Sequence, residues 1–106
     1  MLTNDDRRIA LELKKRLSGK LKLEEIIVFG SRARGDNRKD SDLDIFIKLD
    51  SISKDERGMI SDIAAEIGFD NDCLITTFVA TKDQIEYGPI GANPILRAIY
   101  DEGIQL

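Results

Sequence analysis

The feature that most constrains the fold is a short, continuous apolar run, "EIIVF", at residues 25–29. A strand with one solvated face would alternate between apolar and polar residues. An unbroken run of this length is typical of a strand that is buried on both faces. Such a strand must be covered by other elements, so the sequence predicts a small sheet with helices packed against it.

Other segments around this run supply the helices and the remaining strands. The segment "DLDIFIKL" at 42–49 alternates, so Leu43 and Ile45 face one way while Asp42 and Asp44 face the other. Capping residues mark the helix starts, namely Thr3, Ser53, Thr81 and Asn93. Helices are expected over 3–18, 53–68, 81–88 and 93–103, and strands over 25–29, 42–49 and 73–80, with a short edge strand at 104–106. This order predicts a mixed α/β or α+β fold, with a small mixed sheet flanked by helices, in one domain over residues 1–106.

The residue types that are missing exclude several kinds of chemistry. The chain has no histidine, which removes Ser-His and Cys-His nucleophiles and zinc sites built on histidine. Carboxylates, arginines, lysines, hydroxyls and backbone N–H groups remain, and these suit hard cations and phosphates. A net charge of −4 argues against stable binding to DNA. One cysteine and no long apolar stretch favour a cytoplasmic protein with no membrane segment.

Two polar elements with complementary chemistry lie ten residues apart. Asp42 and Asp44 project from one face of a strand, about 6–7 Å apart at their Cα atoms, where they could share Mg²⁺ ions. Gly30 ends the first strand without a Cβ, so a ligand could approach the backbone, and Ser31 offers a hydroxyl. If the chain turned helical there, free N–H groups would face an anion. Positive charge lies nearby, on Arg32, Arg34, Arg38 and Lys39.

Each element alone has a simpler interpretation. An Asp-x-Asp at a strand edge is more often a solvated face, a Gly-Ser pair is a turn, and "RARGDNRK" is a solvated loop. Together they form the parts of a site for phosphoryl or nucleotidyl transfer, because each supplies what the others lack.

Elsewhere we expect Cys73 to be a small core residue and both tyrosines to pack on helices. The phenylalanines at 29, 46, 69 and 78 are expected in the core or in pocket walls.

The joint pattern resembles a known family. "GS", ten residues and "DLD", after the strand "IIVF", are similar to the signature of the nucleotidyltransferase superfamily that includes DNA polymerase β. The chain resembles most the minimal nucleotidyltransferase (MNT) domains of prokaryotes, over nearly its whole length. The resemblance implies that Asp42 and Asp44 bind Mg²⁺, normally two ions. The residues that it assigns to the triphosphate of ATP, or of another nucleoside triphosphate, are Gly30, Ser31, Arg32 and Arg34.

A third carboxylate is usual in this family, on a later strand, where it helps to bind metal and deprotonate the acceptor. Asp72 is the expected counterpart, with Asp70 as the alternative, just before the strand at 73–80. The simpler interpretation is that Asp70, Asn71 and Asp72 form a helix-to-strand turn. If so, activity would be weak or absent.

The resemblance also implies partners. An MNT protein acts as the antitoxin of a toxin–antitoxin pair, beside a HEPN-type toxin that it adenylylates. We expect that a chain of 106 residues cannot bind a large acceptor by itself, so a second copy or another protein would complete the acceptor site. Two alternatives stay open, an inactive antitoxin that neutralises its partner by occlusion and, less favoured, an antibiotic-modifying enzyme, which would need a further domain.

Overall fold

The computed structural model describes residues 2–36 and 41–106, so Arg38 and Lys39 of the expected positive cluster lie outside the described residues. It has the mixed α+β fold that the sequence predicts. In chain order the elements are α1 (Asn4–Ser18), β1 (Leu23–Phe29), α2 (Gly30–Arg34), β2 (Leu43–Leu49), α3 (Lys54–Asp70), β3 (Ile75–Thr81), α4 (Lys82–Tyr87), the 3-10 helix η1 (Pro89–Ala92), α5 (Pro94–Glu102) and β4 (Ile104–Gln105).

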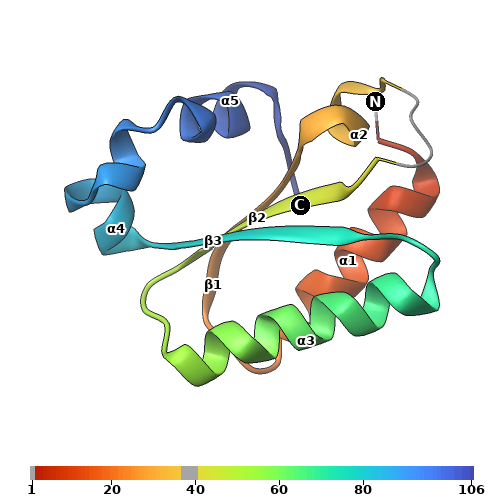
Figure 1. The fold of residues 1–106 in the computed structure, drawn as a ribbon, viewed down its shortest axis with the longest axis horizontal. Helices are drawn as coiled ribbons and strands as arrows, with labels where there is room; N and C mark the ends of the chain where they lie inside the picture. Colours follow the sequence, from red (N-terminus) through yellow and green to blue (C-terminus); the bar gives the residue numbers. More distant parts are fainter. Residues whose placement is uncertain (1, 37–40) are drawn as a thin grey trace.

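Four strands form one mixed sheet in the order β3-β2-β1-β4 (Figure 1). Strand β1 pairs antiparallel with β2 on one side and with β4 on the other, whereas β2 and β3 run parallel. The register places Phe29, the last residue of β1, opposite Asp44 of β2. On its other side Asp44 lies beside Thr76 of β3. These two registers bring the end of β1 and the start of β3 to the same carboxylate.

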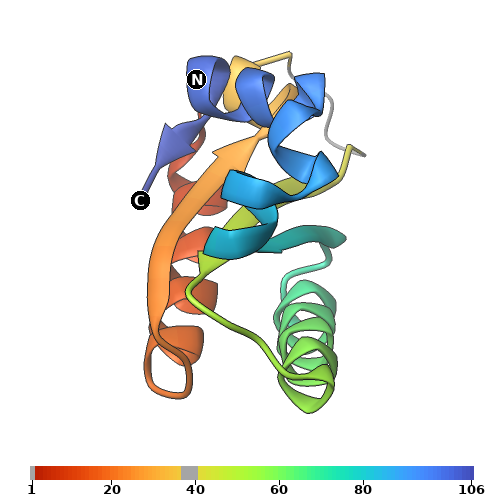
Figure 2. The same cartoon turned by 90° about the vertical axis from the view of Figure 1, so that its left-hand side faces the viewer.

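Helices cover both faces of the sheet, as the apolar run in β1 requires. Helices α1 and α3 lie on one side, and α4 and α5 lie on the other (Figure 1, Figure 2). The larger core lies against α1 and α3 and includes Leu13, Leu17, Ile26, Leu43, Ile45, Ile47, Ile60 and Ile67. The smaller core lies beneath α5 and consists of Ile27, Phe46, Ala80, Leu96 and Ile99. Because β2 alternates, Asp44 shares the second face with Phe46.

The predicted caps are confirmed, and several boundaries differ from the prediction. The side chains of Ser53 and Thr81 each complete a capping box, at the starts of α3 and α4. Helix α3 runs two residues past Gly68, which we expected to end it. A Cβ at residue 68 would overlap the carbonyl of Cys73, so this glycine permits close packing, and the helix ends at Asp70 with Asn71 as its C-cap. Strand β3 accordingly begins at Ile75.

One aromatic prediction is wrong. Tyr87, which we expected to pack, is the last residue of α4 and is 83% exposed. Phe69, near the end of α3, lines a pocket, although its side chain is 89% exposed. Phe46 is fully buried, and Phe29 and Phe78 pack partly against it in the smaller core. Cys73 is half-buried against the larger core.

Within residues 2–36 and 41–106, no helix is long and apolar enough to cross a membrane.

A buried ion pair fixes α2 on α1. The Arg32 guanidinium lies 2.7 Å from an Asp6 carboxylate oxygen, and the two side chains are only 14% and 11% exposed. Arg32 Nε also donates to the carbonyl of Ser41, 2.9 Å away, just before β2. This arginine therefore links the first helix, the short second helix and the approach to the second strand.

We predict strong coupling between Asp6 and Arg32 in stability. Arg32→Met or Asp6→Leu alone should each lower the free energy of unfolding by about 3 kcal/mol, since each leaves a buried charge without its partner. The double variant should lose much less than the sum, as urea denaturation would measure. Additive losses would contradict the buried pair.

Candidate functional site

The site begins where β1 passes into α2, at Gly30. This residue has a φ of +79°, which a glycine adopts without strain. A Cβ at this position would overlap the Asp44 carboxylate, which the β1–β2 register holds directly against the turn. Gly30 is therefore required twice, once for its backbone conformation and once for the closeness of the acidic strand. The contact brings the two predicted halves of the site together.

The two aspartates lie on the face of the sheet that carries Phe46. Asp42 directly precedes β2 and Asp44 is its second residue, with the buried Leu43 between them. Asp42 accepts a hydrogen bond of 3.0 Å from the hydroxyl of Thr76. Thr76 was not predicted from the sequence. Its only signal was a polar residue early in the third strand, and the parallel register that brings it to Asp42 cannot be read from the sequence.

Electrostatics at Asp44 favour a bound cation. Burial raises the pKa of this carboxyl above its ordinary value, and the negative charge of Asp42 raises it further. Arg34 and Arg32 act in the opposite direction and lower the pKa. Because the raising effects prevail, the ionised pair is unfavourable as it stands, and a divalent cation would relieve it.

The two α2 arginines have different surroundings. Arg32 is engaged by Asp6 and by the Ser41 carbonyl, so its side chain supports the fold of the site. Arg34 is half-exposed, with a carboxylate oxygen of Asp36 at 3.2 Å and one of Glu102 at 3.9 Å. Exposed pairs of this kind are weak and exchange readily for a stronger anion. Of the two, Arg34 is better placed to reach a phosphate, and Ser31 lies beside it on α2.

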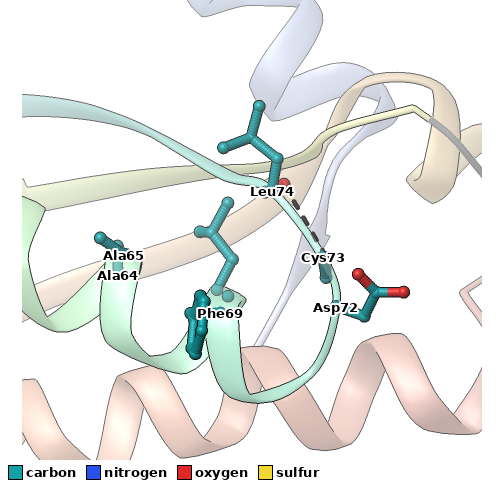
Figure 3. A pocket seen from close by; sticks show the side chains of 8 residues that line it. Ala64, Ala65, Phe69, Asp72, Cys73 and Leu74 are labelled. Carbon is teal, nitrogen blue, oxygen red and sulfur yellow. Dashed lines mark hydrogen bonds between the residues drawn. The ribbon is translucent and has the colours of Figure 1, made fainter.

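Asp72 and Asp70 lie at the junction of α3 and β3. Asp72 is exposed, has a φ of +51°, and lines a shallow pocket with Phe69, Cys73 and Leu74 (Figure 3). Asp70 is the exposed last residue of α3. Among the residues that the structure describes, no three Asp, Glu, Cys or His side chains gather closely enough to hold a metal ion. The metal-binding and catalytic role of Asp72 stays a prediction.

The donors present nevertheless suit Mg²⁺. Two carboxylates on one strand offer hard oxygen ligands, and Mg²⁺ is commonly held by one or two carboxylates together with substrate phosphates. Opposite them, the start of α2 lies directly against the Asp44 carboxylate at Gly30. The arrangement can hold a cation between an acidic strand and a phosphate-bearing ligand.

Comparison with known proteins identifies the family of the chain. The family model for the nucleotidyltransferase domain matches residues 7–104, and the chain belongs to this family. A solved structure described as the crystal structure of a toxin–antitoxin with AMP-PNP has a similar fold, with a TM-score of 0.63 and 20% identity. The match covers 97% of this chain and 72% of that one. No curated protein matches this chain.

We predict that Gly30→Ala will distort the site. The added methyl group would meet the Asp44 carboxylate, and a positive φ costs a non-glycine residue about 1–2 kcal/mol, so stability should fall by at least that amount. The matched control is Gly58→Ala in α3, where the new Cβ would meet no atom within 4 Å apart from its neighbouring residues and the backbone of its own helix. That variant should be stabilised by up to about 1 kcal/mol. Equal melting temperatures for the two variants would contradict the close approach.

A second prediction concerns Asp44 and pH in the absence of metal. The folded protein holds the Asp44 proton more tightly than the unfolded chain does, so its ionisation costs stability as pH rises above the ordinary pKa of 3.8. Asp44→Asn should therefore be more stable than the parent chain near neutral pH, and the gain should vanish below that pKa. Urea denaturation across this range, with Asp62→Asn on the exposed side of α3 as control, would measure it. A gain in stability that persisted below the ordinary pKa would contradict the raised pKa of Asp44.

Proposed function

We propose that the protein is a Mg²⁺-dependent nucleotidyltransferase that moves AMP from ATP to a hydroxyl on a protein partner. The observation that carries the proposal is the contact between Gly30 and Asp44, which puts the turn at the start of α2 against a pair of carboxylates. Membership of the nucleotidyltransferase domain family supports the same reaction class. AMP is favoured over other nucleotides because the protein of similar fold was crystallised with AMP-PNP.

Each part of the site has a role in this reaction. The backbone at Gly30 and Ser31, together with Arg34, would orient the triphosphate, while Arg32 keeps α2 in position. Asp42 and Asp44 would hold Mg²⁺, normally two ions, and Thr76 would orient Asp42 through its hydrogen bond. The bound metal would neutralise charge on the phosphates. The acceptor oxygen forms a bond to the α-phosphorus as the bond to pyrophosphate breaks, and the acceptor proton passes to a carboxylate or to water.

The partner is proposed to be a toxin, with this chain as its antitoxin. The support is the toxin–antitoxin of similar fold, and a HEPN-type toxin is the form that we favour. A cytoplasmic location is consistent with such a pair. The acidic net charge of −4 makes stable binding to DNA unfavourable.

One observation favours a second candidate function. Asp42 and Asp44 lack a third carboxylate among the described residues, and Thr76 holds the adjacent position on β3. An antitoxin of this kind could neutralise its partner by occlusion, with little or no transfer.

Incubation with Mg²⁺, labelled ATP and the product of the adjacent gene tests the proposal. Label should pass to the partner, and Asp42→Asn with Asp44→Asn should abolish transfer, because the carboxylates that hold metal are gone. Circular dichroism would check that this variant still folds. Undiminished transfer by the double variant would refute the site.

Single variants separate the two functions. Asp72→Asn should lower transfer at least 10²-fold if Asp72 acts as the base, a typical contribution of general base catalysis. Thr76→Val should lower transfer less, because it removes only a group that orients Asp42. If the parent chain transfers nothing yet still neutralises the partner, occlusion is the function.

A further inference from the structure

Strand β3 forms an unprotected edge of the sheet. In the part of the chain that the structure describes, it pairs with β2 on one side and with no strand on the other. It is seven residues long and its register with β2 is continuous, without a bulge. Residues 73–81, "CLITTFVAT", contain no charge and no proline. Natural proteins usually protect edges with charges, prolines, bulges or very short strands, as at the two-residue β4 on the opposite edge.

The backbone groups that face outward can be identified. The N–H of Leu43 in β2 donates to the carbonyl of Leu74, 2.9 Å away. In a parallel ladder, alternate residues turn their backbone groups toward the same neighbour, so Thr76, Phe78 and Ala80 also face β2. The N–H and C=O groups of Ile75, Thr77 and Val79 therefore face away from the sheet. At Thr81 the N–H is already bound by the Gln84 side chain, so the open edge ends there.

We propose that this edge pairs with β3 of a second copy of the chain, antiparallel and centred on Thr77. A two-fold axis at Thr77 pairs the outward groups of Thr77 with each other, and those of Ile75 with Val79 of the second copy. All three outward residues then form the hydrogen-bonded pairs of an antiparallel ladder, and the two sheets become one. A two-fold interface of this kind is self-complementary.

Charges at the ends of the strand select this register. Centring on Thr77 brings Asp72, just before β3 of each copy, toward Lys82, the first residue of α4 in the other copy, an attraction that occurs twice. Centring on Val79 would instead set Asp72 against Glu86 and would run the pairing into α4. The charges thus favour the register that uses every outward backbone group.

Exposed apolar side chains at the edge fit the same pairing. Leu74 is 66% exposed and Phe69 is 89% exposed, and Figure 3 shows them close to the strand's start, on opposite sides of the ribbon. In the proposed register Leu74 lies opposite Ala80 of the second copy. Burying such side chains is favourable, whereas large exposed apolar patches are unusual on a monomer.

The pairing also has a consequence for the site. The two-fold axis is perpendicular to the sheet, so the faces that carry Asp44 lie on the same side of the joined sheet. Thr76, which contacts Asp42, would lie opposite Phe78 of the second copy, with that copy's α4 close by. The second copy would thus form one wall next to each candidate site. The interface itself does not depend on the proposed activity.

Sedimentation and light scattering on the purified chain test the interface first. The mass should approach twice the 11.9 kDa of one chain as concentration rises. Thr77→Lys should return it to a monomer, because it places two like charges at the centre of the ladder. Gln105→Lys, which adds the same charge on β4 at the opposite edge, should leave the dimer intact. A monomer at every concentration, or dimers of equal strength in both variants, would overturn the proposal.

Cysteine cross-linking tests the register without weakening the edge. In a Cys73→Ser background, Thr77→Cys should form a disulfide between copies, since paired Cα atoms lie about 5.5 Å apart, within the range that a disulfide spans. Val79→Cys should not cross-link to itself. In this register the two Val79 positions are offset by four residues, so their Cα atoms lie more than about 10 Å apart. Cross-linking of Val79→Cys but not of Thr77→Cys would exclude this register.

Discussion

The approach of Gly30 to Asp44 is the constraint on which the site depends. Strand β1 must end where its register meets the second residue of β2, and the chain must turn there without a side chain. That requirement selects a glycine with a positive φ, and it starts α2 beside the acidic strand. A larger residue would separate the carboxylates from the turn that faces them.

Support for this contact comes from both ends of the chain. Arg32 holds α2 against Asp6 of the first helix, and α2 also reaches α5 through Arg34 and Glu102. On the other side, Thr76 of β3 holds Asp42. Helices α1 and α2 and strand β3 therefore support the geometry of the two carboxylates, which lie close together at the start of β2, an inner strand of the sheet.

The free edge of β3 and the candidate site share one strand. Thr76 turns its side chain to Asp42, while its neighbours Ile75 and Thr77 turn their backbone groups outward. A partner on this edge would lie close to the site without touching the turn at Gly30.

The sequence by itself determined most of the elements, most helix caps, the mixed fold and the pairing of a Gly-Ser turn with Asp42 and Asp44. These follow from local periodicity and capping, which act over a few residues. Only the tertiary structure decided that Arg32 is committed to Asp6, that Thr76 lies at Asp42 and that Phe69 faces solvent. Each of these depends on strand register or helix packing between segments distant in the chain, and no local pattern encodes that.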